Sequence, residues 1–500
     1  MTRLIPTPDG AVTKATAAAA LAVLASVVAS AMLPGRPADA ETRSAATAGA
    51  RAPRADQAVD DRSTADSPIY LPVCARGPVG DLRGVFGLQI SEDRFRDPGM
   101  VQQARALGAD WWRTFVFWDE IERERTRPPT YDWSLYDELL LSGTQQGLRV
   151  IAEIQGNPRW VAEYPGGPPT DLDALAQFVA AAVERYDGDG YRDAPGSPRV
   201  RFWELYNEPD NVDATLAADG RGWGYWGYEG AEYARMLRRV YPAVKLASPE
   251  AIVVFGGVAH DAFVSEDEVE GFFNPEFIDD VLKAGGGPYF DVMNFHYYPL
   301  FAPRWQAYGV GVIGKTAAIK DKLARYGLEP PMLLTEAGSW SDASPPYPPT
   351  TAEEQAWYVA QLHARAIAAE LKTVIWFQLD DVAGTDDPAR GLLDRDLARK
   401  PAYAAYALTA SKLSGVTPAS PVRDTEAPGE VYWFWRGSHR VAVAWTSDGS
   451  VAHIELRTPG ARRTRVTGAS HVVRDNADGK EDGLTHVPYG PEPVFVEPFD

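Results

Sequence analysis

The stretch Phe202–Pro209 reads FWELYNEP, a short aromatic and apolar run that ends in Asn207, Glu208 and Pro209. A second run, Pro331–Gly338, reads PMLLTEAG and contains Glu336 at the corresponding point. Short apolar runs bounded by turn residues are typical of strands buried on both faces. If both runs are strands of one parallel barrel, their C-terminal ends open on the same face, so two glutamates that are distant in sequence converge there.

Similar runs recur along most of the chain and alternate with helix-like stretches. The expected strands are Gly84–Ile90, Trp111–Phe117, Arg149–Ile154, Val200–Tyr206, Ile252–Gly256, Phe290–His296, Met332–Thr335 and Thr373–Leu379. The expected helices are Leu135–Gln146, Leu172–Arg185, Tyr228–Tyr241, Ile278–Ala284, Lys315–Tyr326, Ala352–Leu371 and Pro401–Leu413. Strand–helix units in such a long series favour an α/β fold of the closed (β/α)8 TIM-barrel type over an open doubly wound sheet. We therefore expect a barrel domain over residues 69–415.

The last part of the chain changes character. Val431–Trp435 and Arg440–Trp445 are strand-like runs that flank Gly437 and Ser438, and shorter runs follow between Gly, Pro and Asp. This pattern predicts a small C-terminal all-β, sandwich-like domain over residues 416–500. Ile69–Val73 is a candidate for an additional strand of that domain.

The N-terminus has the features of an export signal. Arg3 and Lys14 precede the apolar stretch Ala15–Leu33, and the A-x-A pattern of Ala38–Ala40 follows it. Residues 1–40 are therefore expected to be a signal peptide or a membrane anchor. Residues 41–68 contain almost nothing large and apolar, which predicts a disordered linker. The expected location is secreted or at the cell surface.

Composition excludes several classes of protein. The chain has 500 residues and a net charge of −20, which argues against nucleic acid and anionic membranes as partners. No membrane contact is expected beyond the N-terminal anchor. The only cysteine, Cys74, excludes an intrachain disulfide framework, and the 7 histidines show no metal-ligand spacing. We expect neither a metal nor a cofactor, and a neutral substrate.

Taken together, the two glutamates on the fourth and seventh expected strands resemble the catalytic pair of the clan A glycoside hydrolases, which include families 5 and 39. The resemblance covers roughly residues 84–413. It implies a retaining glycosidase that hydrolyses β-glycosidic bonds in a carbohydrate by double displacement, with Glu208 as acid/base and Glu336 as nucleophile. Such a pair is about 5–5.5 Å apart, against roughly 6.5–9.5 Å in an inverting enzyme.

The resemblance also implies substrate-binding residues. These are Asn207 on strand four, Arg113 on strand two, His296 and Tyr298 on strand six, and Trp376 on strand eight; Asn157 and Trp160 resemble family 39. Asn207 would hold the sugar 2-hydroxyl, and Tyr298 and Arg113 would keep Glu336 ionised. Trp376 would give the sugar a flat apolar face, although a packing role stays open for Trp376 and His296.

Other functions stay open at this point. A transglycosylase on the same fold and a non-catalytic carbohydrate-binding barrel are the nearest. Gly309–Thr316 (GVGVIGKT) also satisfies the phosphate-loop pattern, but the segment before it, Phe301–Gln306, is broken by Pro and Arg and is unlike the buried strand that such a loop requires. We expect a plain loop before a helix, with Lys315 solvated and its replacement by alanine nearly neutral.

Overall fold

The computed structural model describes residues 82–163, 167–212, 226–260, 273–343, 349–382 and 388–499, together with Val79. The expected signal or anchor (1–40), the linker (41–68), Cys74 and the candidate strand Ile69–Val73 lie outside these residues. Among the described helices, none has the length and apolar character needed to cross a membrane.

A parallel sheet forms the centre of the molecule. Its strands follow the order β5-β4-β3-β2-β1-β8-β7-β6. Their bounds are Phe86–Gln89 (β1), Trp111–Phe117 (β2), Arg149–Gln155 (β3), Phe202–Leu205 (β4), Ile252–Val254 (β5), Met293–Tyr297 (β6), Met332–Ala337 (β7) and Val374–Trp376 (β8). Isolated bridges from Val254 to Val292 and from Val258 to Phe295 join the β5 side to the β6 side. The predicted (β/α)8 barrel is confirmed.

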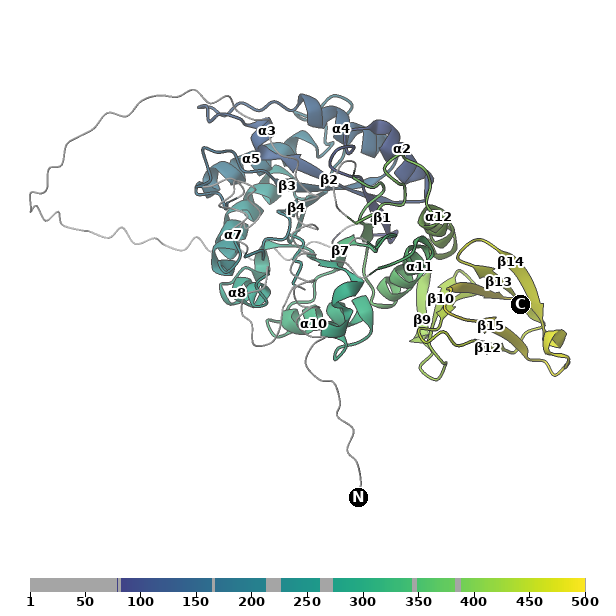
Figure 1. Cartoon of the computed structure of the whole chain (residues 1–500). Coiled ribbons are helices and arrows are strands. Elements are labelled where there is room, and N and C mark those ends of the chain that lie inside the picture. The colour runs from purple at the N-terminus through teal and green to yellow at the C-terminus, as the bar shows by residue number, and fades with distance from the viewer. Residues whose placement is uncertain are drawn as a thin grey trace, which may run out of the picture.

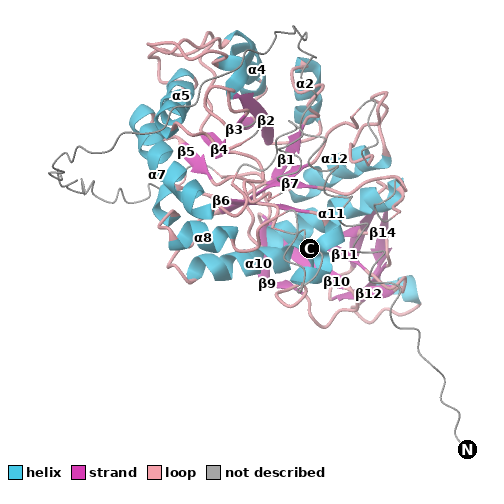
Figure 2. Cartoon of the chain, turned by 60° about the vertical axis from the view of Figure 1, so that its left-hand side comes forward, coloured by secondary structure: helices cyan, strands magenta, loops and turns pink. Residues whose placement is uncertain are grey.

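Helices surround the sheet (Figure 2). They are Pro98–Ala106 (α2), Trp118–Ile121 (α3), Ser134–Gln145 (α4), Leu172–Arg185 (α5), Gly230–Ala247 (α7), Phe277–Lys283 (α8), Ala302–Trp305 (α9), Gly311–Ala324 (α10), Ala352–Ala368 (α11) and Pro401–Leu413 (α12), with short 3-10 turns at Gly287–Tyr289 (η1) and Pro299–Phe301 (η2). Helix α2 was not expected from the sequence. Only Met100, Val101 and Ala104 of α2 are buried, so its apolar stripe is weak, and its start depends on a cap by Asp97.

The barrel interior has an apolar floor and a polar layer above it. Trp111, Ile151, Phe202, Ile252, Val254, Val292, Leu333 and Ile375 pack together as the floor. Side chains alternate between the two faces of a strand, so residues two positions further along point inward again. Gln89, Arg113, Glu153 and Glu204 occupy such positions, and all are buried, as are Asn294 and Thr335. Buried polar groups need hydrogen-bond partners, and most of these side chains supply them to one another. The layer lies directly beneath the residues at the C-terminal mouth of the barrel.

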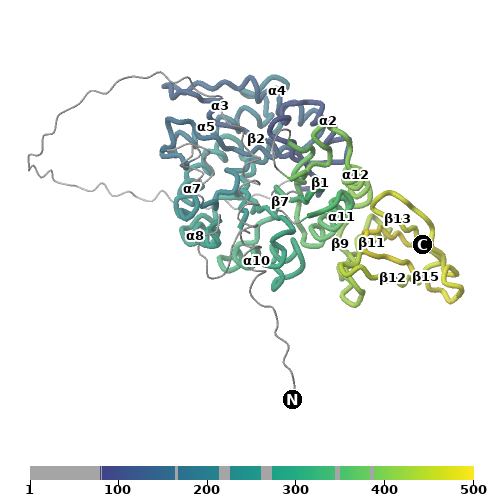
Figure 3. The backbone as a smooth tube through the Cα atoms, viewed as in Figure 1, coloured from purple at the N-terminus to yellow at the C-terminus, as the bar shows by residue number. Residues whose placement is uncertain are grey.

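The C-terminal strands form a separate antiparallel region beside α11 and α12, as predicted (Figure 1; Figure 3 follows the path of the chain). Their bounds are Thr417–Arg423 (β9), Glu430–Arg436 (β10), His439–Trp445 (β11), Ala452–Leu456 (β12), Gly460–Arg465 (β13), Ser470–Arg474 (β14), Thr485–Tyr489 (β15) and Val494–Pro498 (β16), with a 3-10 turn at Asp475–Asp478 (η3). One sheet has the order β14-β13-β16-β11-β10-β9, and β12 pairs with β15. Tyr432, Phe434, Val443 and Trp445 belong to the same apolar cluster as the barrel helices.

A buried ion pair reinforces this junction. Arg365 of α11 donates two hydrogen bonds to Glu430 of β10, and Tyr432 donates a third at 2.6 Å. Burial favours the neutral carboxyl, but Arg365 and Tyr432 outweigh it and lower the pKa of Glu430. A lowered folded-state pKa means that this stabilisation is present above the ordinary carboxyl range and is lost as the pH falls through the lowered pKa.

Replacing Glu430 with alanine should therefore destabilise the protein strongly. Arg365 would stay buried without its partner, and breaking a buried pair from one side costs about 3–5 kcal/mol. Chemical denaturation at neutral pH measures the effect. The control is Glu250→Ala, which breaks the exposed pair between Arg199 and Glu250 and should cost less than about 1 kcal/mol. Equal losses in the two variants would contradict this account of the junction.

Candidate active site

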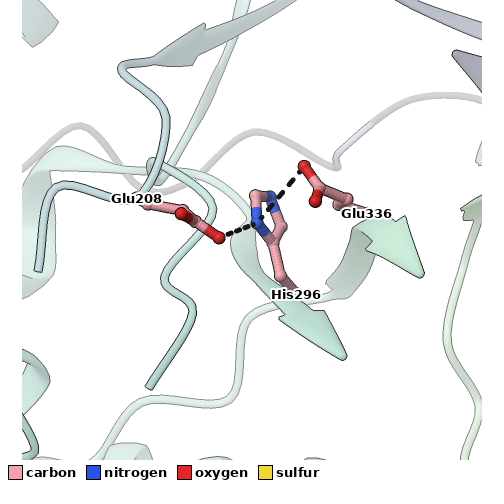
Figure 4. Close-up of side chains that lie close together, drawn as sticks. All are labelled: Glu208, His296 and Glu336. Carbon is pink, nitrogen blue, oxygen red and sulfur yellow. Dashed lines mark hydrogen bonds and ion pairs between the residues drawn. The ribbon is translucent and has the colours of Figure 1, made fainter. Parts of the chain in front are cut away.

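Two carboxyl groups meet at the C-terminal mouth of the barrel. Glu208 follows β4 and Glu336 lies near the end of β7, and both are 4% exposed. The imidazole of His296, from β6, lies between them (Figure 4). Its Nδ1 is 3.0 Å from Glu208 Oε1 and 3.6 Å from Glu336 Oε2. An oxygen of Glu208 lies within 4.8 Å of an oxygen of Glu336.

The backbone after β4 turns sharply to aim Glu208 inward. Tyr206 has φ 69° and Glu208 has φ 41°, both in the left-handed region that residues with a Cβ seldom adopt. Each such residue costs on the order of 1–3 kcal/mol, so the surrounding structure must hold it. Glu208 N donates to Gly257 O at 3.0 Å, and Tyr206 N donates to Ile154 O at 3.0 Å. These bonds fix the turn to the neighbouring strand ends.

A single guanidinium organises the polar layer beneath the pair. Arg113 donates to Glu204 through Nε at 2.8 Å and through a terminal nitrogen at 2.9 Å. It also donates to Gln89 Oε1 at 2.8 Å and to Asn207 Oδ1 at 2.8 Å. Glu153 Oε2 lies 2.8 Å from it, without the alignment of a hydrogen bond. One positive charge therefore faces several carboxyl groups, and burial raises the pKa of Glu153 to about 8.

The surroundings of Glu336 favour its ionised form more than those of Glu208 do. Tyr298 donates to Glu336 Oε1 at 2.5 Å, and an Arg113 nitrogen lies 3.8 Å from Oε2. Burial raises the pKa of Glu336, while Arg113, the Tyr298 hydrogen bond and Arg390 each act to lower it. Of the two glutamates, Glu336 is thus the one surrounded by groups that stabilise a negative charge.

Glu208 has the opposite environment. Burial, the charge of Glu336 and then Asp210 raise its pKa well above the ordinary carboxyl range. Asp210 accepts hydrogen bonds from the backbone of Ala259 and His260, and burial raises its own pKa to about 7. Burial and two nearby cations keep the pKa of His296 well below its usual value, so the imidazole is neutral. Two neighbouring carboxyls whose pKa values are pushed apart by their surroundings suit acid and base roles.

Four of the expected substrate-binding residues gather around the pair. Arg113, His296 and Tyr298 contact one or both glutamates, and Asn207 is held against Arg113. Trp376 is a correction to the sequence prediction. It is 0% exposed, its ring packs against Tyr358 of α11, and its indole donates to Arg390 O, so it belongs to the outer core. The next residue, Phe377, packs with Tyr298 and Trp340 instead.

Asn157 and Trp160 also have other roles than the expected one. Asn157 uses both ends of its amide internally, because Nδ2 donates to Gly167 O and Oδ1 accepts from Tyr206. Trp160 packs edge-on against Trp118 at 5.4 Å and donates to Glu122 O. These contacts hold the loop after β3, and neither residue contacts the carboxyl pair.

Lys315 is a second correction. As expected, no strand directly precedes Gly309–Thr316, since the turn η2 and the helix α9 lie between β6 and this segment. However, helix α10 already begins at Gly311, and Lys315 is 0% exposed rather than solvated. Its ammonium group donates to the carbonyl of Ala259 and, at 2.7 Å, to that of His296. Lys315 thus ties the end of β6 to the segment after β5, directly behind the carboxyl pair.

Several residues of the site were not identified from the sequence. Glu204 accepts from Arg113, from Asn294 at 2.9 Å and from Gly257 N at 3.1 Å. Thr335 accepts from Asn294 at 2.7 Å and lies 3.3 Å from His296 Nε2. The sequence feature that could have identified them is a charged or amide side chain inside an otherwise apolar strand. Burying such a side chain costs free energy unless it has a hydrogen-bond partner.

Among the residues that the structure describes, two groups of side chains have the proximity that a metal ion requires. Glu208, His296 and Glu336 form one, and Asp187, Asp189 and Asp193 on a surface loop form the other. In the first group Tyr298 donates to Glu336 Oε1, and an Arg113 nitrogen lies 3.8 Å from Glu336 Oε2. A nearby fixed cation disfavours a second positive charge, so the first group suits carboxyl chemistry better than metal binding.

The position of Lys315 predicts a strong effect of its replacement. Lys315→Met keeps most of the side-chain volume but removes the ammonium donor from two buried carbonyls, at roughly 1–3 kcal/mol for each group. Stability should fall by at least that amount, and turnover should fall because the backbone of His296 is no longer held. Lys320→Met, on the exposed side of the same helix, is the control for denaturation and kinetics. Near-identical behaviour of the two variants would restore the expectation of a solvated Lys315.

Comparison with known proteins shows which solved structures share this fold. No family model matches the chain, and no curated protein sequence matches it. Solved structures do match. A family 39 glycoside hydrolase from Bacteroides cellulosilyticus WH2 has a TM-score of 0.61 at 20% identity, over 83% of this chain and 80% of that one. A family 39 β-xylosidase from Caulobacter crescentus has a TM-score of 0.55 at 18% identity, over 85% and 97%.

A third likeness lies outside family 39. A family 30 endoxylanase from Clostridium papyrosolvens C71 matches with a TM-score of 0.50 at 12% identity, over 84% of this chain and 98% of that one. In each case most of both chains is covered. The chain therefore shares the fold of solved clan A glycoside hydrolases of the (β/α)8 type.

Proposed function

We propose that this protein is a retaining glycoside hydrolase that cleaves β-glycosidic bonds by double displacement, with Glu336 as nucleophile and Glu208 as acid/base. The observation that carries the proposal is the spacing of the pair. Oxygens of the two carboxyls lie within 4.8 Å, and both groups are at the mouth of the barrel. Retaining pairs are about 5–5.5 Å apart, and an inverting pair needs roughly 6.5–9.5 Å to admit a water.

The electrostatic asymmetry supports the assignment of roles. In the first step ionised Glu336 attacks the anomeric carbon, and the glycosidic bond breaks as Glu208 gives its proton to the leaving oxygen. Glu208 Oε1 is engaged by His296, whereas the buried Oε2 has no partner among the described residues and is the atom available to carry that proton. The raised pKa of Glu208 keeps the proton in place until it is needed.

In the second step Glu208 acts as the base and Glu336 becomes the leaving group. Glu208, now ionised, takes a proton from water while the water oxygen attacks the anomeric carbon, and the bond to Glu336 breaks. Tyr298 and Arg113 stabilise the returning negative charge on Glu336. An acceptor sugar in place of water would make the enzyme a transglycosylase, and product analysis with added acceptors distinguishes the two reactions.

Substrate contacts follow from the groups left free at the mouth. Arg113 holds Oδ1 of Asn207, which leaves the Nδ2 group to donate to the sugar 2-hydroxyl, a contact that strengthens at the transition state. Phe377 and Trp340 pack with Tyr298 at the mouth of the barrel. We propose that they, rather than Trp376, give the sugar its flat apolar surface. Because two of the similar structures are named as a β-xylosidase and an endoxylanase, aryl β-xylosides are the first substrates to test.

Export through the N-terminal segment remains part of the proposal.

Azide rescue tests the roles directly. Glu336→Gly should abolish nearly all turnover, and azide should restore part of it as the α-glycosyl azide, because the anion enters the space that the nucleophile leaves. Glu208→Ala should lose about 10²–10⁴-fold on substrates with poor leaving groups, which need the acid, and spare those with good ones.

With azide, the Glu208→Ala variant should give the β-glycosyl azide. Proton NMR of the anomeric centre reads both products. Azides of the opposite configuration from the two variants would reverse the assignment of nucleophile and acid.

The pH profile tests the electrostatics. Activity needs Glu336 ionised and Glu208 protonated, so kcat/KM should rise as the first loses its proton and fall as the second does. Tyr298 lowers the pKa of Glu336, so Tyr298→Phe should raise that pKa and move the acidic limb to higher pH. Tyr326→Phe, an exposed tyrosine after α10, is the control. An acidic limb that stays in place, or moves to lower pH, contradicts the Tyr298 contact as the cause.

A further inference from the structure

The C-terminal domain contains a cleft of its own, separate from the barrel mouth. Its volume is about 870 Å³, within the range of about 300–1,000 Å³ typical of ligand sites. The lining comes from the loop before β10, from β10 and β11, from β12 and the turn after it, and from the residues at Pro498 and Phe499. Nothing in the proposed reaction uses this cleft.

One wall of the cleft is aromatic. Trp433 and Trp435 are two residues apart on β10 and therefore point to the same face of the sheet. Trp433 is 7% exposed and anchors that wall in the domain core, whereas Trp435 is 39% exposed. The tight turn between β10 and β11 sets Arg440 opposite Trp435, with its guanidinium 4.1 Å from the Trp433 ring and 5.5 Å from the Trp435 ring. An exposed indole inside a cleft is costly to hydrate and is available for stacking.

The other wall is polar and carries charges of both signs. Asp424 and Glu426 come from the loop before β10, and His453 and Glu455 from β12, with Arg457 beyond them. Within the described part of the chain, Arg440 and Arg457 have no carboxylate partner at ion-pair distance. The cleft thus offers both donors and acceptors without a strong net charge.

We propose that this cleft binds a neutral oligosaccharide, with a sugar ring stacked on Trp435 and its hydroxyls bonded to Arg440 and the polar wall. A sugar ring combines a flat C–H face with hydroxyls that both donate and accept, and the cleft presents the complementary groups. A polyanion would meet Asp424, Glu426 and Glu455 as well as the net charge of −20. Such a site would hold a polymeric carbohydrate on the same molecule as the barrel.

Affinity electrophoresis of the full chain tests the proposal. Gels contain neutral polymers (arabinoxylan, mixed-linkage β-glucan, galactomannan) or anionic ones (polygalacturonate, carboxymethyl cellulose). The Glu336→Gly background prevents digestion of the gel, so the result does not depend on turnover. Retardation by at least one neutral polymer is expected, and Trp435→Ala should weaken it about tenfold or more, as the loss of a stacking contact of this kind predicts.

A matched control separates the cleft from general surface effects. Tyr191 is 59% exposed and has the Arg192 guanidinium 5.1 Å from its ring, so Tyr191→Ala removes a similar aromatic–arginine pair from the barrel surface. It should leave retardation unchanged. Circular dichroism checks that Trp435→Ala is folded, and Arg440→Ala, at an exposed position, is the second variant if it is not. The proposal is overturned if no neutral polymer retards the chain, if only anionic polymers do, or if the cleft variants behave like Tyr191→Ala.

Discussion

The buried guanidinium of Arg113 is the constraint on which the barrel interior depends. It lies above the apolar floor and contacts Glu204, Glu153 and Glu336, with only Glu204 held in a two-point hydrogen-bonded pair. One positive charge cannot balance three buried carboxylates. Burial, together with the charges of Glu204 and Glu336, raises the pKa of Glu153 to about 8, although Arg113 acts to lower it. The charge state of the mouth is therefore determined partly by the layer beneath it.

The two glutamates at the mouth differ because their other neighbours differ. Arg113 acts to lower the pKa of both, so it cannot by itself distinguish an acid from a nucleophile. Tyr298 adds a hydrogen bond on one side, and Asp210 adds a negative charge on the other. These neighbours favour the protonated form of Glu208 relative to that of Glu336, and the proposed reaction takes its direction from this difference.

Sequence reasoning succeeded where the signal is local. The bounds of β2 and of helices α5 and α12 agree with those predicted, because an apolar run marks β2, Asp171 caps α5 and Pro401 begins α12. The NEP motif gave Asn207 and Glu208. It failed where both faces of a strand are buried: Trp376 and Phe377 are equally apolar, and only closure of the barrel decides which one faces the mouth. The prediction of a solvated Lys315 was wrong for another reason. The carbonyls that accept its hydrogen bonds belong to Ala259 and His296, which are distant from it in sequence.

The proposed reaction requires a covalent intermediate on Glu336. A 2-deoxy-2-fluoro-β-glycoside with a good leaving group slows both steps but slows release more, so the intermediate accumulates and can be located by mass spectrometry of proteolytic peptides. We predict one added sugar per chain, on the peptide that contains Glu336, with no label in the Glu336→Gly variant. A label on the peptide that contains Glu208, or turnover that inverts the anomeric configuration without any labelled peptide, would contradict the account.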